Sequence, residues 1–307
     1  MDDQREVIAF LSEGASYGRP AAAVERIETH ISIVFLVADR AYKLKRAVRF
    51  SYVDYSTPAL REKHCRAELA LNRRTAPALY LCVRAITRGP GGNLAFDGDG
   101  AVLDWVVEMR RFSERDLFDR LAEAHKLTPD LMRDLADAVA GFHGAAEIAP
   151  GGGRAGIAET IAANRHNLLR SCPPLDPQEV EKLHAAWTAA LSAVGGLLDV
   201  RRDEGKVRRC HGDLHLRNIC LLDGRPTPFD CIEFSDRLAC IDVLYDLAFL
   251  LMDLVRRGLN GLASIVFNRY LDLTADLDGL PALPLFMSMR AAVRALVAAT
   301  LARQNGA

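Results

Sequence analysis

The stretch that decides the fold is CHGDLHLRNICLLDGRPTPFDCIEF, residues 210–234. It contains Asp213 and, five residues later, Asn218, and after a turn and a second apolar stretch comes Asp230. Phosphoryl transfer from ATP needs a carboxylate that orients the attacking hydroxyl and oxygen ligands that hold Mg²⁺ against the phosphates. An Asp-x-x-x-x-Asn loop followed by a hairpin that ends in Asp supplies both. We therefore expect Asp213 to be the base, and Asn218 and Asp230 to be Mg²⁺ ligands.

The same stretch resembles a known family. HGDLHLRN (211–218) resembles the catalytic loop of aminoglycoside phosphotransferases and related small-molecule kinases of protein-kinase-like fold. PFDCIEF (228–234) is similar to that family's metal-binding segment, and DVLYDLAFL (242–250) to the helix that follows it. With AYKLKR (41–46) and LNRR (71–74), the sequence most resembles an uncharacterised bacterial branch that is sometimes fused to a P-loop kinase domain. No G-x-x-x-x-G-K-[ST] string occurs, so we expect no such domain in this sequence.

The resemblance implies an α+β, protein-kinase-like fold with two lobes. We expect a small β-rich N-lobe over residues 1–109, which binds the nucleotide. A larger helical C-lobe over residues 110–307 is expected to carry the catalytic residues and the acceptor site.

The resemblance also implies a lysine and a glutamate that act together. In this fold a strand lysine holds the α- and β-phosphates, and a helix glutamate fixes that lysine. The string AYK, which ends at Lys43, matches the kinase strand, so Lys43 is the first candidate; Lys45 lies on the same strand face and stays open. Glu68 best fits the pairing glutamate, with Glu62, near the helix start, as the alternative.

Three further nucleotide contacts follow from position in the fold. The hinge is expected at VVEMRRF (106–112), where the backbone C=O of Glu108 and the N–H of Arg110 would bind the edge of the adenine. THISI (29–33) stands where protein kinases have a glycine-rich loop, and Ser32 is its candidate phosphate contact.

Other polar residues near the motif are expected to be structural. Of Asp242 and Asp246, one can cap a helix and the other can hold the catalytic loop through its backbone N–H groups. His211 and His215 are expected to brace that loop, because three zinc ligands confined to one turn would need a further partner. Glu233 is expected to have a plain surface or loop role, with an approach to the metal as the alternative.

Hydrophobic periodicity and turn residues predict the order of elements. In the N-terminal part we expect helices over 5–15, 20–28 and 57–74, and strands over 31–37, 41–46, 80–87 and 101–109. The string FDGDG suggests that 93–109 forms a hairpin. Later in the chain we expect short strands within 207–236 and helices over 129–147, 157–170, 178–199 and most of 240–307.

Composition narrows the class of protein. The 307 residues include 39 Lys and Arg against 40 Asp and Glu, a net charge of -1, with 50% hydrophobic and 26% charged residues. This composition is typical of a folded soluble protein, and the balance of charge does not favour a nucleic-acid binder. No run of ~18 apolar residues and no secretory signal occurs, so we expect a cytoplasmic protein with no membrane partner. The seven cysteines form no CxxC pair and are expected to be reduced packing residues.

The function expected from all of these features is ATP- and Mg²⁺-dependent transfer of the γ-phosphoryl group to a hydroxyl of a small molecule. An aminoglycoside-like sugar, a nucleoside or another metabolite would fit. Helices over 157–199 and 240–300 are expected to line the acceptor site, and their mixed charges do not favour a polycation.

Two other functions stay open. A protein Ser/Thr kinase of the same fold would need a peptide-docking segment after Asp230, and only eleven residues separate Asp230 from Asp242. A non-catalytic nucleotide-binding regulatory module would not need the base Asp213. The oligomeric state is left open.

Overall fold

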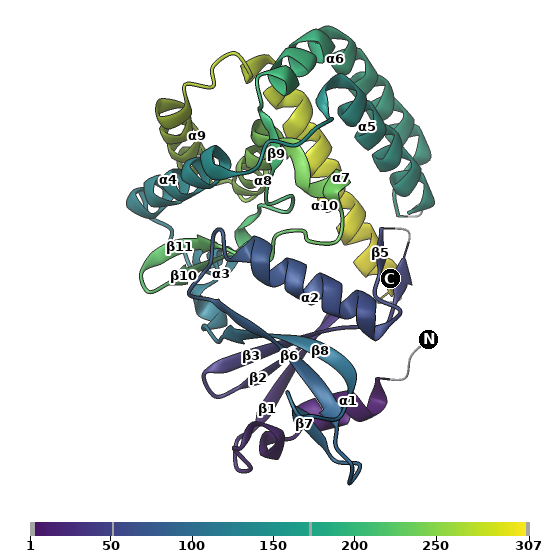
Figure 1. Ribbon diagram of the computed structural model, residues 1–307. Coiled ribbons are helices and arrows are strands. Elements are labelled where there is room, and N and C mark those ends of the chain that lie inside the picture. Colours follow the sequence, from purple (N-terminus) through teal and green to yellow (C-terminus); the bar gives the residue numbers. More distant parts are fainter. Residues whose placement is uncertain (1–3, 51, 172–173, 305–307) are drawn as a thin grey trace. The chain divides into compact units, whose positions relative to one another are not determined.

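The chain forms two compact units. The computed structural model describes residues 4–50, 52–171 and 174–304 (Figure 1). The first unit runs up to Asp116 and also includes Thr227–Asp236; the second comprises Leu117–Pro226 and the chain from Arg237 onward. The predicted limits of 1–109 and 110–307 differ from these units at 110–116 and 227–236. As a division of tasks between two lobes, those limits stay a prediction.

A six-stranded antiparallel sheet forms the first unit, with the strand order β1-β2-β3-β8-β6-β7 (Figure 1). Its strands are β1 (Val24–Glu28), β2 (Ser32–Val37), β3 (Arg40–Lys45), β6 (Tyr80–Arg88), β7 (Leu94–Phe96) and β8 (Ala101–Arg110). A separate short hairpin pairs β4 (Arg49–Phe50) with β5 (Val53–Asp54).

The two faces of this sheet differ in character. Apolar residues on one face, among them Phe35 and Leu44, pack with Val7 and Leu11 of helix α1 (Arg5–Leu11). Because side chains alternate along a strand, the lysines next to Leu44 in β3 point to the opposite face. Helix α2 (Pro58–Asn72) covers that face.

Helix α2 begins as the sequence predicts. The Thr57 side chain accepts a hydrogen bond from the Leu60 N–H at 3.3 Å, and Pro58 occupies the first helical position. The buried guanidinium of Arg61 donates to Asp104 of β8 at 2.7 Å and so ties the helix to the sheet.

Two local predictions for this unit were wrong. Residues 20–28 do not form a helix: Val24–Glu28 is an edge strand that pairs residue by residue with β2, because tertiary pairing outweighs the helix propensity of this alanine-rich stretch. The hairpin expected over 93–109 does not form either. The strands β7 and β8 both pair with β6, which lies between them, and the tight reversal is Gly89–Asn93 instead.

The second unit is mainly helical, as predicted. Its helices are α3 (Phe118–Glu123), α4 (Pro129–Ala145), α5 (Gly153–Arg170), α6 (Pro177–Asp203), α7 (Asp236–Ala239, whose first residue belongs to the first unit), α8 (Val243–Arg256), α9 (Asn260–Thr274) and α10 (Leu283–Gln304). Two short strand pairs accompany them: β9 (Val207–Arg209) with β12 (Cys240–Asp242), and β10 (Ile219–Leu222) with β11 (Arg225–Pro228, whose last two residues belong to the first unit).

Helix α8 lies at the centre of this unit. All residues from Val243 to Leu254 are buried, which is typical of a helix with protein on every side. Helix α10 packs against it, and leucines from both helices join one large core together with Phe286 and Met289 of α10. Since α8 is enclosed, any charged side chain along it must find its partners inside the protein.

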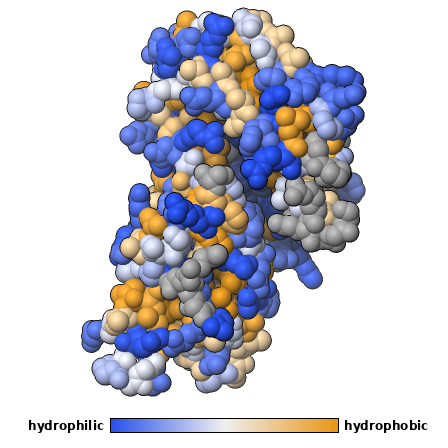
Figure 2. Space-filling view, turned by 90° about the vertical axis from the view of Figure 1, so that its right-hand side faces the viewer, coloured by the Kyte–Doolittle hydropathy of each residue, from blue (hydrophilic) through white to orange (hydrophobic). Residues whose placement is uncertain are grey.

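Two segments, Pro177–Asp203 and Leu280–Thr300, are long and apolar enough to cross a membrane by length and composition alone. Core helices of soluble proteins pass the same test, so this is weak support for a membrane span. On the face drawn in Figure 2, hydrophilic residues are interspersed with apolar ones.

A buried ion-pair network anchors α6. The guanidinium of Arg201, which is 1% exposed, donates to both oxygens of Asp242 at 2.7 and 2.8 Å and to both oxygens of Asp276 at 2.6 and 3.0 Å. One Asp242 oxygen also accepts the Leu244 N–H at 2.8 Å, so Asp242 caps α8, as predicted for one of the two aspartates.

We expect Arg201→Met to lower the free energy of unfolding by ~3–5 kcal/mol, because it leaves the buried Asp242 without a cation and Asp276 with only Lys206, at 3.8 Å. The neighbouring Arg202 forms exposed pairs with Asp199 and Asp203, so Arg202→Met is the matched control and should leave the urea midpoint close to that of the wild type. Urea unfolding followed by circular dichroism measures both variants. Equal effects would contradict the assigned role of Arg201.

Candidate functional site

A buried carboxylate in the first unit holds two lysines. Lys43 and Lys45 lie two residues apart on β3 and both point toward Glu68 of α2, which is fully buried. The Lys43 Nζ lies 2.7 Å from Glu68 Oε1, and the Lys45 Nζ lies 2.6 Å from Glu68 Oε2. The alternative partner, Glu62, pairs with the exposed Arg66 at 2.8 Å instead. The structure thus brings the predicted lysines and Glu68 together.

Charge compensation fixes the ionisation of this cluster. Burial alone would raise the pKa of Glu68, but the two ammonium groups outweigh burial and lower that pKa to about 2. Burial alone would lower the pKa of each lysine, and the facing carboxylates raise both pKa values well above 10.5 instead. All three groups are therefore charged at neutral pH.

The remaining contacts distinguish the two lysines. The Lys43 side chain is 14% exposed and its Nζ also lies 2.5 Å from Oδ1 of Asp230. The Lys45 side chain is only 1% exposed, and its Nζ pairs with Glu233, which also accepts a hydrogen bond from the Tyr55 hydroxyl at 2.7 Å. The expected surface or loop role of Glu233 was wrong, because its side chain is buried in this ion-pair cluster.

The chain around Asp230 is held in an unusual backbone conformation. Asp230 has φ of 61°, in the left-handed region that few non-glycine residues adopt. Its N–H donates to the Tyr80 hydroxyl at 3.1 Å, and the next N–H, that of Cys231, donates to Oδ1 of Asn72 at 2.9 Å. These bonds to β6 and α2 fix the direction of the Asp230 carboxylate. Left-handed non-glycine residues held in this way cluster at functional sites.

Three other predicted nucleotide contacts lie elsewhere in the first unit. Ser32 is buried, and its N–H donates to the Thr29 side chain at 3.0 Å, which closes the turn between β1 and β2. Glu108 lies within β8, and its side chain lies 3.4 Å from that of Arg84. The Arg110 N–H donates to the Leu79 carbonyl at 2.8 Å, so the structure does not support Arg110 as a donor to adenine. Ser32 and Glu108 stay predictions.

In the second unit, one carboxylate organises the predicted catalytic loop. Asp246 of α8 is fully buried and accepts the N–H of His211 at 3.0 Å and the N–H of Gly212 at 2.9 Å. This confirms the loop-holding role predicted for one of the two aspartates. Gly212 has φ of 82°, a conformation that glycine adopts without a steric cost.

The loop presents Asp213 with one oxygen occupied. Asn218 Nδ2 donates to Oδ2 of Asp213 at 2.8 Å and to its backbone carbonyl at 3.0 Å, and His215 Nε2 lies 3.4 Å from the same Oδ2. Within the part of the chain that the structure describes, no hydrogen bond is assigned to Oδ1 of Asp213. The side chain is 38% exposed, so this oxygen is the one left to accept a further hydrogen bond.

The pKa of Asp213 lies well below its ordinary value of 3.8. Burial would raise that pKa, but the neighbouring His215, with His211 and Arg290 behind the loop, outweighs burial. The carboxylate is therefore ionised at neutral pH and can accept a hydrogen bond from a hydroxyl. The predicted bracing role of the histidines is confirmed: the Asp213 N–H donates to Nδ1 of His211 at 3.4 Å.

Two predicted metal ligands have the right chemistry for Mg²⁺. Asn218 uses its Nδ2 in the bonds to Asp213, which leaves its amide oxygen as a donor to a metal. The Asp230 carboxylate is 42% exposed and uses Oδ1 for Lys43, which leaves Oδ2. Both are hard oxygen donors of the kind that Mg²⁺ prefers. Asn218 belongs to the second unit and Asp230 to the first.

Sequence reasoning missed several residues that support the loop. His143 of α4 is buried, with Nε2 3.1 Å from Asp246 and Nδ1 2.9 Å from the Tyr270 hydroxyl. Asp253, seven residues after Asp246 on the same face of α8, accepts the Leu216 N–H at 3.2 Å. The sequence signal that could have identified Asp253 is a single charged residue inside an apolar helical run, FLLMDLV (249–255).

The cysteines near the two clusters behave as packing residues. Cys65, next to the lysine–glutamate cluster, and Cys231, next to Asp230, are buried, and burial raises the pKa of each thiol to about 12. Cys210 and Cys220 are buried as well, while Cys82 is exposed. Cys172 lies outside the described residues.

We expect Glu68→Gln to lower the free energy of unfolding by ~3 kcal/mol at pH 7, because two buried lysines lose a shared counter-charge. The pKa of Glu68 is lowered from 4.5 to about 2 on folding, so its stabilising effect is complete above pH 4.5 and is lost as the pH falls toward 2. The difference between wild type and variant should therefore narrow over that window. Urea unfolding at several pH values measures it, and Glu62→Gln, an exposed pair on the same helix, is the control.

Comparison with known proteins agrees with this geometry. Residues 32–283 match the family model described as the phosphotransferase enzyme family, APH. An uncharacterized protein of Mycobacterium tuberculosis and one of Mycobacterium bovis are each 29% identical over 278 residues, which cover 88% of this chain and 53% of the relative. The chain thus spans about half the length of these curated relatives.

Solved structures show the same fold at low sequence identity. A choline kinase from Cryptosporidium parvum superposes with a TM-score of 0.59 at 11% identity, over 97% of this chain and 90% of that one. A choline/ethanolamine kinase family protein from Mesorhizobium loti gives a TM-score of 0.54 at 15% identity, over 98% and 87%. The fold is protein-kinase-like, and with the match over residues 32–283 the chain belongs to the APH phosphotransferase enzyme family.

Proposed function

We propose that the protein transfers the γ-phosphoryl group of ATP, as its Mg²⁺ complex, to a hydroxyl group of a small molecule. The observation that carries this proposal is the environment of Asp213: its Oδ2 is fixed by Asn218, and its ionised side chain is 38% exposed. A module that only binds nucleotide has no use for such a carboxylate. Family membership supports the phosphotransferase part of the proposal.

In the proposed reaction, Asp213 orients the acceptor. Its Oδ1 accepts a hydrogen bond from the acceptor hydroxyl and takes the proton as the oxygen bonds to the γ-phosphorus, while the bond from that phosphorus to the β-phosphate oxygen breaks and ADP leaves. Asn218 prevents the carboxylate from rotating, because it bonds both Oδ2 and the backbone carbonyl of the same residue. Holding the reacting groups in place in this way is the main catalytic contribution that phosphoryl transfer requires.

Lys43 is the residue that we assign to the phosphates. It is the more exposed of the two lysines, and Glu68 already holds it in place. Asn218 and Asp230 would hold Mg²⁺, which neutralises phosphate charge when bound. Lys45, enclosed between Glu68 and Glu233, keeps the cluster together and has no direct contact with the nucleotide in this proposal.

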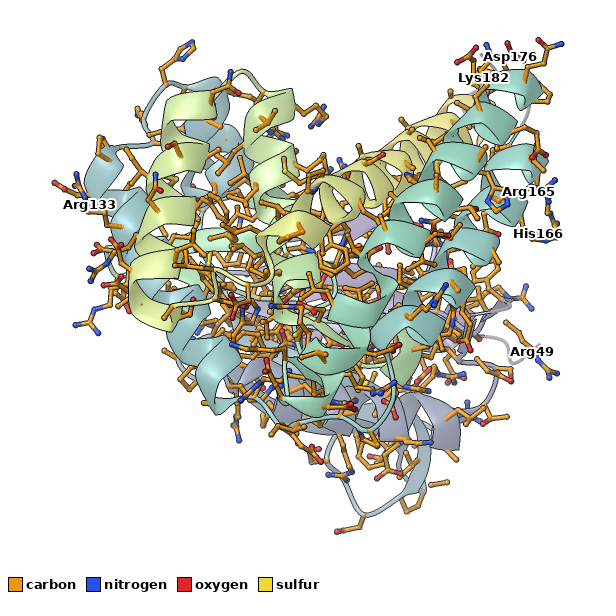
Figure 3. The ribbon with its side chains drawn as sticks, turned by 90° about the horizontal axis from the view of Figure 1, so that it is seen from above. Arg49, Arg133, Arg165, His166, Asp176 and Lys182 are labelled. Carbon is orange, nitrogen blue, oxygen red and sulfur yellow. The ribbon has the colours of Figure 1, made fainter. Side chains whose placement is uncertain are left out.

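The acceptor that we propose is a neutral or singly charged hydroxyl compound, such as a sugar, nucleoside or other metabolite. Acidic residues on the helices expected to line the acceptor site are paired with basic ones: Glu181 with Arg165 at 2.5 Å, and Asp253 with Arg256 at 3.0 Å. Figure 3 shows Arg165 and Lys182 pointing outward from α5 and α6. Pairing of this kind leaves less negative charge to attract a polycation.

A cytoplasmic location fits this reaction. ATP and Mg²⁺ are both supplied there, and Cys65, Cys82 and Cys231 are free thiols, which a reducing compartment favours. We propose no nucleic-acid or membrane partner. The segment after Asp230 contains only α7 and β12 before α8 begins, which leaves little chain for docking a peptide.

A direct test offers the purified protein MgATP with a panel of sugars, nucleosides and amino alcohols, and casein in parallel. Mass spectrometry detects an added phosphoryl group on each acceptor. Phosphorylation of a metabolite supports the proposal, and phosphorylation of casein alone favours a protein kinase. ATP binding without transfer to any acceptor or to water would favour a regulatory module.

We expect Asp213→Asn to lower kcat by about 10² to 10⁴-fold, because the acceptor hydroxyl loses its base. Nucleotide affinity, measured by calorimetry, should stay near that of the wild type, since Asp213 is not assigned to the nucleotide. Asp134→Asn, on the exposed face of α4, is the matched control. Unchanged turnover in Asp213→Asn would show that another group serves as the base.

Substitution of the two lysines should give opposite patterns. Lys43→Met is expected to lower kcat/KM for ATP by about 100-fold with a modest effect on stability. Lys45→Met is expected to lower the free energy of unfolding by ~3–5 kcal/mol, because it leaves Glu233 buried without a cation. Steady-state kinetics and urea unfolding on both variants measure the pair of effects, and the reverse pattern would assign the phosphates to Lys45.

A further inference from the structure

Arg290 of α10 is a charged side chain enclosed in the second unit. It is 5% exposed, and its guanidinium lies 3.9 Å from the centre of the Tyr245 ring and 4.7 Å from that of Phe249. Burying a guanidinium removes it from water at a considerable cost in free energy. The contacts that compensate this cost therefore indicate what the residue does.

Two backbone carbonyls accept its hydrogen bonds. Arg290 Nε donates to the carbonyl of Tyr245 on α8 at 3.1 Å, and Nη1 donates to the carbonyl of Gly212 at 3.2 Å. Nη2 lies 3.9 Å from Oδ1 of Asp246 and is without a hydrogen-bond partner among the described residues. One planar group on α10 thus links α8 to the residue that precedes Asp213.

Gly212 is consequently held at both of its backbone polar groups. Asp246 accepts its N–H at 2.9 Å, and Arg290 donates to its carbonyl at 3.2 Å. A glycine at φ of 82° has many alternative conformations, and rotation of its peptide groups would redirect the chain at Asp213. Without the Arg290 bond, the plane of the peptide between Gly212 and Asp213 would be held only by the long hydrogen bond from the Asp213 N–H to Nδ1 of His211, at 3.4 Å.

We propose that Arg290 is a positioning residue for phosphoryl transfer, which fixes the Gly212–Asp213 peptide and thereby the direction of the Asp213 carboxylate. This inference rests on the proposed function of Asp213. Arg290 touches neither nucleotide nor acceptor in the proposed reaction. Its loss therefore misplaces the base and leaves substrate binding intact, and a misplacement of about 1 Å can cost about 100-fold in rate.

Three variants separate positioning from packing. Arg290→Met keeps an unbranched apolar stem against Tyr245 and Phe249 but removes the donors. Arg290→Lys keeps a positive charge and can reach one carbonyl. Arg294→Met, one helical turn further along α10, is the matched control.

For Arg290→Met we expect kcat to fall by about 10- to 100-fold while KM for ATP and for the acceptor changes less than about twofold. Amide hydrogen exchange of residues 210–218 should become faster, and Arg290→Lys should recover part of both properties. Arg294→Met should match the wild type. A purely structural role would instead lower the melting temperature and leave kcat per folded molecule unchanged.

Wild-type kcat and wild-type exchange in Arg290→Met would overturn the proposal. If Arg290→Met does not fold, the Arg290→Lys variant provides the test. An intermediate kcat with unchanged KM would support the positioning role, and a wild-type kcat would overturn it. The hydrogen-exchange measurement separates failure of this inference from failure of the proposed function. If the wild-type protein transfers no phosphoryl group, faster exchange in the variants still supports loop positioning, and unchanged exchange rejects it.

Discussion

An ionised side chain can be buried only where opposite charge or hydrogen-bond donors replace its water, and each unit is organised around one carboxylate that meets this condition. In the first unit Glu68 gives one oxygen to each of two lysines. In the second, Asp246 accepts two backbone N–H groups of the catalytic loop and a contact from His143. Lys43, which we assign to the phosphates, pairs directly with Glu68. Asp213, which we assign to the acceptor, follows the residues whose N–H groups Asp246 accepts.

Side chains whose charges are compensated in this way are also held in fixed positions. Under the proposed function, the protein need not reorganise Glu68, Lys43 and Asp213 when charge develops on the transferred group, because these side chains are already ionised and already bonded. Asp230 is also held in place: its backbone is in a left-handed conformation, and its N–H donates to the Tyr80 hydroxyl. The free energy required for this arrangement is supplied during folding, so the proposed site is preorganised before any substrate binds.

Contacts between residues that are close together in the sequence were predicted best. Asp213 and Asn218 are five residues apart, so their contact follows from the loop itself. The choice between Lys43 and Lys45 could not be made, because it depends on Asp230, 187 residues away along the chain. Arg290 belongs to no sequence motif. Its proposed role could be inferred only from its hydrogen bond to the Gly212 carbonyl in the folded protein. The helix predicted over 20–28 failed because local propensity cannot register pairing with β2.

The buried cysteines have a chemical consequence. A thiol whose pKa is about 12, as for Cys65 and Cys231, is almost entirely protonated at the pH of a cell and is a poor target for peroxide or electrophiles. Both thiols lie beside the charged residues assigned to the nucleotide. Oxidation of these two thiols is therefore expected to be slow, in contrast to that of the exposed, low-pKa thiolates that peroxide attacks first.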